Sequence, residues 1–319
     1  MTTLSLSSIQ LRHDHVLMTH ELLAAGYDDR DITRMVRTGE LHRLRHGAYT
    51  FGQLWQELDV VERRKLVAHA TLRSARSSAA LAGPSAADVL GVPVWDMGDT
   101  THLVRLDQLA NRRKCKKAQH RGSLLVEDLT VRDGVPVTSG TRTALDMIAI
   151  GDVAHALVTV NGLLHAGETT LELLQRRAAG MRHDPHTADT GIVLDLADPR
   201  PESAGESLTV YLCWAQGLPM PIPQFEIRDH DGRLVGRVDF AWPDLGVFLE
   251  FDGKVKYEHH RRPGESVADA VLREKQREDA IREITGWRCI RIVWADLFQP
   301  ERTAARIRAA FGAGRWLAA

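Results

Sequence analysis

The chain has 319 residues, of which 44% are hydrophobic and 26% are charged. These values are typical of a globular protein and exclude a wholly disordered or fibrous chain. At about 100–200 residues per domain, the length leaves room for two or three domains. The 41 basic and 42 acidic residues give a formal net charge of -1, so any binding to nucleic acid must use local basic patches.

Three further patterns bear on the compartment. No run of about 18 apolar residues occurs, so we expect no membrane-spanning helix and no membrane partner. Residues 1–20 lack a basic start followed by a continuous apolar core, which a secretory signal requires. Cys115, Cys213 and Cys289 are odd in number and far apart, which argues against a disulfide framework. We therefore expect a cytoplasmic protein.

Residues 1–52 contain two short helical patterns followed by a hairpin pattern. Each expected helix has a polar cap before it and a glycine after it: Thr19 and Gly26 for residues 20–25, and Asp28 or Asp29 and Gly39 for residues 31–38. Over residues 41–46, Leu41, Arg43 and Arg45 alternate with His42, Leu44 and His46, and Gly47 provides a turn before residues 48–51. Two helices followed by a small hairpin are the order of a winged helix-turn-helix.

The basic side chains of this segment are candidates for contacts with DNA. Arg30, Arg34 and Arg37 have the spacing i, i+4, i+7 and so share one face of the second helix. Arg43 and Arg45 add positive charge to the hairpin. A helix in the major groove and a wing on the phosphates would use these charges. The alternative is a small module for protein contacts with solvated arginines, because several acidic residues dilute the patch.

This segment resembles the N-terminal winged-helix domain of AbiEi-type antitoxins. The matching stretches are Leu-Leu-Ala-Ala-Gly26, Ile32-Thr-Arg-Met-Val-Arg37-Thr-Gly-Glu-Leu41 and Arg43-Leu-Arg-His-Gly47-Ala-Tyr49. The resemblance implies DNA binding, a place in a toxin–antitoxin-like system, and a cognate toxin or regulatory protein as a partner.

The remaining chain divides by pattern into three parts. Residues 53–180 mix helical and strand patterns, so we expect a middle α+β module there. Residues 181–201 carry prolines and acids without a clean period, and we interpret them as a linker. Residues 202–319 predict a third domain with the element order αβββαβα: helix 203–216, strands 225–227, 233–242 and 246–254, helix 267–284, strand 287–294 and a final helix from residue 300. The whole chain is thus expected to be a multidomain protein of α/β and α+β class.

The strand expected at 246–254 carries an unusual set of charges. Because side chains alternate between faces, Glu250, Asp252 and Lys254 project from the same face. A purely structural core strand would not do this, since an unpaired buried charge costs several kcal/mol. A hairpin at residues 243–246 would bring Asp239 alongside Glu250 and Asp252, and Glu206 on the preceding helix is a candidate fourth acid.

Clustered carboxylates that stay ionised need a compensating cation, and hard oxygen ligands suit Mg²⁺ or Mn²⁺. Asp239, Glu250 and Asp252 are therefore the candidate metal ligands. Such a site can hydrolyse a phosphodiester bond, with Lys254 orienting a water molecule and offsetting phosphate charge.

The spacing of an aspartate, about a dozen residues and an acid-x-lysine resembles the PD-(D/E)XK nuclease superfamily. Asp239 with Asp252-Gly-Lys254 fits this pattern, and so does Asp239 with Glu250, where Asp252 would occupy the usual place of the lysine. Further stretches resemble the endonuclease-like domains related to very-short-patch-repair nucleases, the DUF559 group: Gly-Glu206-Ser, Val-Asp239-Phe-Ala-Trp, Glu250-Phe-Asp-Gly-Lys254-Val-Lys256-Tyr257, Glu274-Lys275-Gln-Arg277-Glu-Asp, Gly286-Trp287-Arg and Trp294-Ala-Asp-Leu. The resemblance implies a restriction-endonuclease-like αβββαβ core.

The resemblance also implies roles for single residues. It makes Glu206, Asp239, Glu250, Asp252, Lys254 and Lys275 the catalytic set, with Lys275 and Arg277 on the scissile phosphate. Many relatives carry a histidine shortly after the Glu-x-Asp-Gly segment, where this chain has Lys256-Tyr257, so the general base stays open.

Two interpretations follow. In the first, a metal-dependent endodeoxyribonuclease is directed to DNA by its winged helix and acts in bacterial defence or a toxin–antitoxin-like system. In the second, a non-catalytic antitoxin-like transcriptional regulator keeps a nuclease fold for binding, because a fold does not prove an activity. The sequence does not separate DNA from RNA as the substrate.

Overall fold

The structure is a computed structural model that describes residues 15–75, 77–106, 112–114, 117–120, 124–180, 189–253 and 266–314. The chain forms two compact units. Unit 1 comprises Met1–Gly151 and Glu168–His186, and unit 2 comprises Asp152–Gly167 and Thr187–Ala319. None of the helices in the described ranges has the length and apolar character needed to cross a bilayer.

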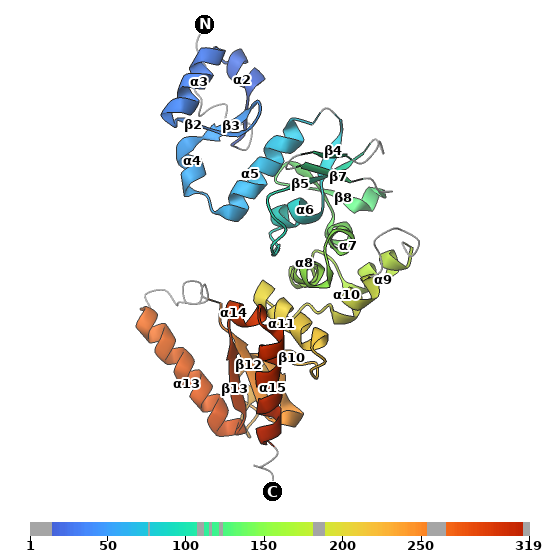
Figure 1. The fold of residues 1–319 in the computed structure, drawn as a ribbon, viewed down its shortest axis with the longest axis vertical. Coiled ribbons are helices and arrows are strands. Elements are labelled where there is room, and N and C mark those ends of the chain that lie inside the picture. Colours follow the sequence, from blue (N-terminus) through green and yellow to red (C-terminus); the bar gives the residue numbers. More distant parts are fainter. Residues whose placement is uncertain are drawn as a thin grey trace. The chain divides into compact units, whose positions relative to one another are not determined.

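Unit 1 begins with two helices against a three-stranded antiparallel sheet of order β1-β3-β2 (Figure 1). The elements in chain order are β1 (Leu17–Met18), α2 (Thr19–Ala24), α3 (Asp29–Thr38), β2 (Leu41–Arg45) and β3 (Ala48–Phe51). Leu17, Leu22, Ile32, Met35 and Leu41 form the buried core between them.

The caps of α3 agree with the prediction from the sequence, although the helix begins at Asp29, two residues earlier than expected. The Asp28 side chain accepts a hydrogen bond from the backbone N–H of Asp31 at 2.7 Å, and Gly39 ends the helix with φ +79°. The start of α2 differs from the prediction, because Thr19 is the first helical residue and Met18 precedes the helix. The Glu21 side chain stabilises this helix start by accepting a hydrogen bond from the backbone N–H of Met18 at 2.8 Å.

The rest of unit 1 is built on a six-stranded sheet of order β6-β7-β5-β4-β9-β8. Its strands are β4 (Ala79–Leu81), β5 (Thr101–Arg105), β6 (Arg112–Lys114), β7 (Lys117–His120), β8 (Leu129–Arg132) and β9 (Val135–Thr138). Its helices are α4 (Gly52–Glu57), α5 (Val60–Arg73), α6 (Gly83–Val89), the short 3-10 turn η1 (Val126–Asp128), α7 (Gly140–Ile150) and α9 (Leu171–Gly180). A mixed α+β module was expected in this region.

Unit 2 begins with helices α8 (Val153–His165) and α10 (Thr190–Leu196). Neither position was expected from the sequence, which favoured placing residues 153–165 in the middle module and a linker at 181–201. Asn161 explains the first difference, because its side chain donates to the Ser207 hydroxyl at 3.2 Å and accepts the backbone N–H of Asp198 at 2.9 Å. Residues 181–188 of the expected linker lie outside the described residues.

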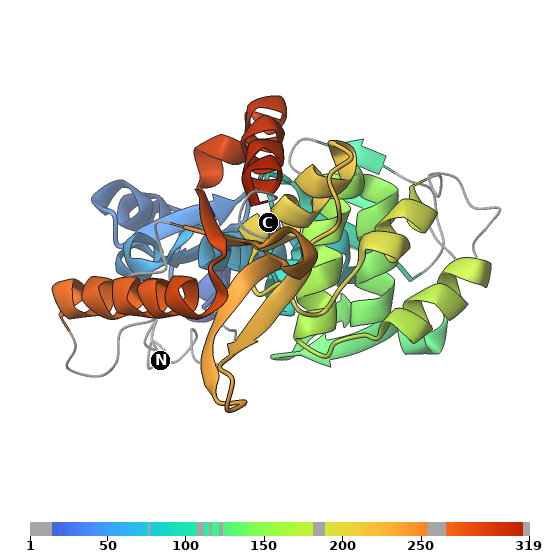
Figure 2. The same ribbon diagram turned by 90° about the horizontal axis from the view of Figure 1, so that it is seen from below.

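The remaining elements of unit 2 follow the expected αβββαβα order, with the 3-10 turn η2 and the short helix α14 in addition. They are α11 (Ala204–Ala215), β10 (Ile222–Arg228), β11 (Leu234–Trp242), the 3-10 turn η2 (Pro243–Leu245), β12 (Val247–Phe251), α13 (Val267–Thr285), β13 (Arg288–Ile292), α14 (Trp294–Leu297) and α15 (Pro300–Gly314). The sheet order is β10-β11-β12-β13, with β12 and β13 parallel and the other neighbours antiparallel. Figure 2 shows the β10–β11 hairpin extending beyond the helices.

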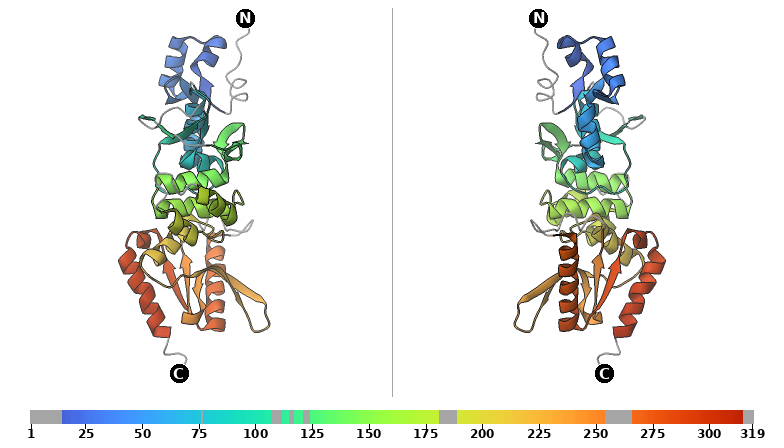
Figure 3. Two further views of the ribbon diagram at one scale, coloured as in Figure 1. Left: turned by 90° about the vertical axis from the view of Figure 1, so that its right-hand side faces the viewer. Right: turned by 90° about the vertical axis from the view of Figure 1, so that its left-hand side faces the viewer.

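Helices cover both faces of this sheet (Figure 3). Ile281 of α13 packs on the face that holds Phe248, and Phe311 of α15 meets Trp242 edge-on at 5.1 Å between ring centroids. Helix α11 approaches β12 closely, since a Cβ added at Gly205 would lie 2.0 Å from Cε1 of Phe251. The absence of a side chain at residue 205 therefore sets the distance between α11 and the acid-bearing strand.

We expect Gly205→Ala to destabilise unit 2 by about 1–3 kcal/mol, because the added methyl group overpacks a rigid aromatic contact. The matched control is Gly191→Ala in α10, where an added Cβ meets nothing within 4 Å and alanine favours the helix. Chemical denaturation followed by circular dichroism measures both changes. Equal stability of the two variants would contradict this account of the packing.

Candidate functional site

Two buried acids of unit 2 lie on neighbouring strands. The registered pairs of β11 and β12 end at Phe240 and Leu249, and one step further along the same register Asp239 falls opposite Glu250. The carboxylate of Asp239 accepts the backbone N–H of Phe251 at 2.8 Å, which fixes it against β12. Asp239 is 9% exposed and Glu250 is 8% exposed. The hairpin between these strands therefore brings the two acids side by side, as expected from the sequence.

Glu250 is paired with a cation from the helix that follows it. Nη2 of Arg277 on α13 lies 2.9 Å from Oε1 of Glu250, and Nη1 of Arg277 donates to the backbone oxygen of Arg237. The guanidinium offsets a carboxylate that would otherwise be buried at a cost of several kcal/mol. Arg277 was expected to bind the scissile phosphate, but in this structure it contacts Glu250, an acid of the site. Lys275 on the same helix is exposed.

Glu206 is held by its own helix terminus and by β10. It is 2% exposed, and its carboxylate accepts the backbone N–H of Glu202 at 2.9 Å, the Ser203 hydroxyl at 2.7 Å and the Gln224 side-chain amide at 2.7 Å. Ser203 caps the same helix through the N–H of Glu206. A serine three residues before a glutamate is the sequence signature of a capped helix start, so part of the role of Glu206 is structural.

Gln224 was not singled out from the sequence. It lies in β10 with φ +51°, a left-handed backbone conformation that is rare outside glycine, and its amide reaches Glu206. Such strain persists only where surrounding contacts impose it, and it is concentrated at functional sites. No local pattern around Gln224 signals this conformation, because it depends on the contact with α11.

The candidate metal ligands do not form a complete cage. Among the described residues, no three His, Cys, Asp or Glu side chains are grouped so that they could hold a metal ion. Asp252 is half-buried, and its backbone N–H donates to the carbonyl of Ile292 at 2.8 Å. Lys254 lies outside the described residues. The described part of the site is therefore the pair Asp239 and Glu250, with Asp252 one residue beyond the end of β12.

The basic residues of the N-terminal module differ in exposure. Arg30, Arg34 and Arg37 are exposed on α3, and Arg34 pairs with Asp31 at 2.7 Å. Arg43 on β2 is also exposed. Arg45 is half-buried, donates to the carbonyl of Thr71 on α5 at 3.2 Å, and has a pKa lowered by burial. Arg45 therefore anchors the hairpin to α5, whereas the other four arginines face solvent.

A comparison with protein families bears on this module. The model of the family described as "Transcriptional regulator, AbiEi antitoxin" matches residues 10–52. The N-terminal segment matches that antitoxin family. The resemblance inferred from the sequence is thereby confirmed for this segment, and the match ends before the strands that carry the buried acids.

Two curated relatives come from Mycobacterium tuberculosis, one from strain CDC 1551 and one from strain H37Rv. Each is described as an uncharacterized protein and is 34% identical to this chain over 154 residues, which are 48% of this chain and 53% of the relative. The chain therefore spans about half the length of the curated relatives it matches.

Two cysteines in unit 2 are unsuited to nucleophilic chemistry. Burial raises the pKa of the Cys213 thiol to about 12. Burial, together with the charges of Glu278 and Glu250, raises the pKa of the Cys289 thiol to about 12 as well. Both thiols are thus protonated near neutral pH, and the thiolate is the reactive form.

We expect both thiols to react with Ellman's reagent about a thousandfold more slowly in the native protein at pH 8 than in guanidinium chloride, since the thiolate fraction falls about tenfold per pH unit below the pKa. The Cys115→Ser variant leaves only these two thiols for the measurement. The native rate should rise with pH from 8 to 10. Fast native labelling at pH 8 would show that one of the thiols is accessible and ionised.

Proposed function

We propose that the protein binds DNA through its N-terminal module and acts as an antitoxin-like regulator in a toxin–antitoxin or defence system. The match of residues 10–52 to the antitoxin family carries this proposal. It is supported by Arg30, Arg34 and Arg37, which are exposed on α3, the second helix before the β2–β3 hairpin. The Arg34–Asp31 pair is no obstacle, because an exposed ion pair is worth less than about 1 kcal/mol and can exchange for a phosphate.

A salt titration of DNA retardation tests this role. Each phosphate contact contributes about 0.9 to the slope of log affinity against log salt, so Arg30→Gln and Arg37→Gln should each weaken binding and lower the slope by about one. The control is Arg228→Gln on β10, an exposed arginine paired with Glu226 at 2.6 Å. Equal slopes for all the variants and the parent chain would assign DNA binding to another surface or exclude it.

A second function is favoured by the acids of unit 2. We propose that this unit is a metal-dependent nuclease that cleaves phosphodiester bonds with Mg²⁺ or Mn²⁺. Mg²⁺ keeps several waters and is usually bound by one or two carboxylates together with substrate phosphates. The adjacent, buried Asp239 and Glu250 fit that requirement. Asp252 is the first residue after β12, which carries Glu250.

The other residues have supporting roles in this proposal. When bound, the metal would supply an activated water and stabilise the leaving oxygen. Lys254 would orient the water, and Glu206 would hold β10, the neighbour of the strand that carries Asp239, in place through Gln224. Lys275 and Arg277 would bind the scissile phosphate, with Arg277 exchanging part of its contact to Glu250 for the substrate.

Nicking of supercoiled plasmid in Mg²⁺ or Mn²⁺ tests the nuclease. Asp239→Asn and Glu250→Gln should each reduce the rate about 100-fold or more, because they remove charge at the metal ligands without changing side-chain size. The control is Asp244→Asn in η2, where the carboxylate is exposed. RNA of matched sequence, digested in parallel, distinguishes the two substrates.

The results separate the two functions. If DNA retardation depends on Arg30 and Arg37 and no cleavage occurs in either metal, only the regulatory function remains. Cleavage that survives Asp239→Asn would place the activity elsewhere and remove the nuclease proposal for this site.

A further inference from the structure

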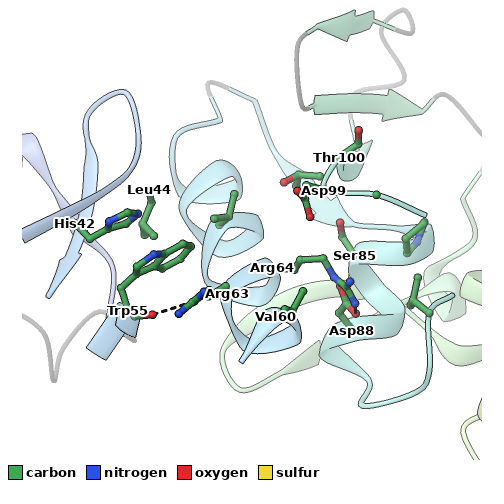
Figure 4. Close-up of a pocket in the computed structure, with 15 residues that line it drawn as sticks. His42, Leu44, Trp55, Val60, Arg63, Arg64, Ser85, Asp88, Asp99 and Thr100 are labelled. Atoms are coloured by element: carbon green, nitrogen blue, oxygen red, sulfur yellow. Dashed lines mark hydrogen bonds and ion pairs between the residues drawn. The ribbon is translucent and has the colours of Figure 1, made fainter. Parts of the chain in front are cut away.

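Unit 1 contains a cavity of about 400 Å³ beside the N-terminal hairpin. One face of α5 lines it with Val60, Arg63, Arg64 and Val67, which have the spacing i, i+3, i+4, i+7. Strand β2 and helix α4 line one side, and α6 with residues 94–101 lines the other (Figure 4). The volume falls in the range of small-molecule sites, about 300–1,000 Å³.

The side of the cavity next to the hairpin is aromatic. The rings of His42 and Trp55 are stacked with centroids 4.3 Å apart and an interplanar angle of 9°. Both side chains are half-buried, and Leu44 lies beside them (Figure 4). A planar ring can stack on the outer face of this pair or meet its edge, since aromatic rings pack best in offset or edge-on arrangements.

The electrostatics of this side favour an anion. The guanidinium carbon of Arg63 lies 5.2 Å from the Trp55 ring centroid, and its nitrogens donate to the carbonyls of Trp55 at 2.9 Å and Gln56 at 3.3 Å. Within the described ranges, no carboxylate pairs with Arg63. Burial and, to a smaller degree, the charge of Arg63 lower the pKa of His42, so protonation of this imidazole is disfavoured and Arg63 is the main cation on this side of the cavity.

The opposite side of the cavity offers no unpaired cation to an anionic ligand. Arg64 and Asp88 form two hydrogen bonds of 2.9 and 2.7 Å and so neutralise each other. The Ser85 hydroxyl accepts the backbone N–H of His102 at 2.9 Å, which leaves its own proton available to a ligand. Asp99 lies on this side, away from His42 and Trp55 (Figure 4), and it would repel an anionic group. A ligand's negative charge is thus directed toward Arg63.

We propose that this cavity binds a small planar aromatic acid, with its ring against Trp55 and His42 and its carboxylate toward Arg63. The site is separate from the acids of unit 2 and from the exposed arginines of α3. Binding to the full chain is measured without DNA, so the result does not depend on the proposed regulatory or nuclease functions.

Isothermal calorimetry with three indole probes tests the proposal. Indole-3-acetate is the anionic probe, indole-3-acetamide is neutral and tryptamine is cationic. We expect indole-3-acetate to bind about tenfold or more tightly than tryptamine, because the charge of Arg63 attracts one and repels the other.

Four variants locate the site. Arg63→Gln should remove the preference for the anion, and Arg63→Lys should keep it, because only the charge is required. Val60 is 63% exposed, so Val60→Trp should fill the cavity and abolish binding without disturbing the core. Arg228→Gln in unit 2 is the control and should bind like the parent chain. Circular dichroism checks that each variant is folded.

Two results would overturn the proposal. A useful site would be detected at probe concentrations up to about 5 mM. If none of the three probes binds saturably in that range, the cavity is not a site for aromatic acids. Equal affinity for the anionic and cationic probes, or binding that survives Val60→Trp, would refute the assigned ligand class or the assigned place.

Discussion

Burial of carboxylates in the sheet of unit 2 is the constraint from which much of this unit follows. Asp239 and Glu250 are both nearly inaccessible, and such groups must be paired to avoid a cost of several kcal/mol each. A backbone N–H of β12 serves Asp239, and a guanidinium from α13 serves Glu250. The placement of α13 over this face of the sheet therefore has an electrostatic reason as well as the apolar contact made by Ile281.

The same constraint accounts for the backbone of β10. Glu206 is the most deeply buried of these acids, and three donors from two elements satisfy its carboxylate. The third donor comes from Gln224, whose left-handed conformation costs of order 1–3 kcal/mol. The contact with Glu206 offsets part of that cost. The strained backbone of β10 thus supplies a donor to the buried carboxylate, and the hydrogen bond to that carboxylate stabilises the strained conformation.

Much of the fold was predictable from local patterns. The elements of residues 202–319 follow from apolar periodicity and from turn residues such as Gly246 and Gly286, both of which adopt positive φ. Alternation along β12 also predicted that Asp239 and Glu250 meet across a hairpin. Residue type and position narrowed the cap of α3 to Asp28 or Asp29, and the structure has Asp28 there.

Features that depend on distant contacts were not predictable in this way. The pairing of Arg277 with Glu250 and the anchoring of Arg45 to Thr71 are tertiary contacts between elements 26 or more residues apart. Helix α10 was missed because its buried face consists only of Val193 and Leu196, too few apolar positions to establish a period. The fit of Gln224 to Glu206 has no local signal at all.

Helix α5 connects the features of unit 1 that bear on function. Its Arg73 donates to the carbonyl of Val16 at 2.7 Å and pairs with Glu21, which in turn holds the start of α2. Its Leu66 and Ala70 pack against β1 and β3. Another side of the same helix forms the floor of the cavity. Helix α5 thus packs on the N-terminal sheet with one side and lines the cavity with another, so the cavity and this sheet share one rigid, close-packed helix.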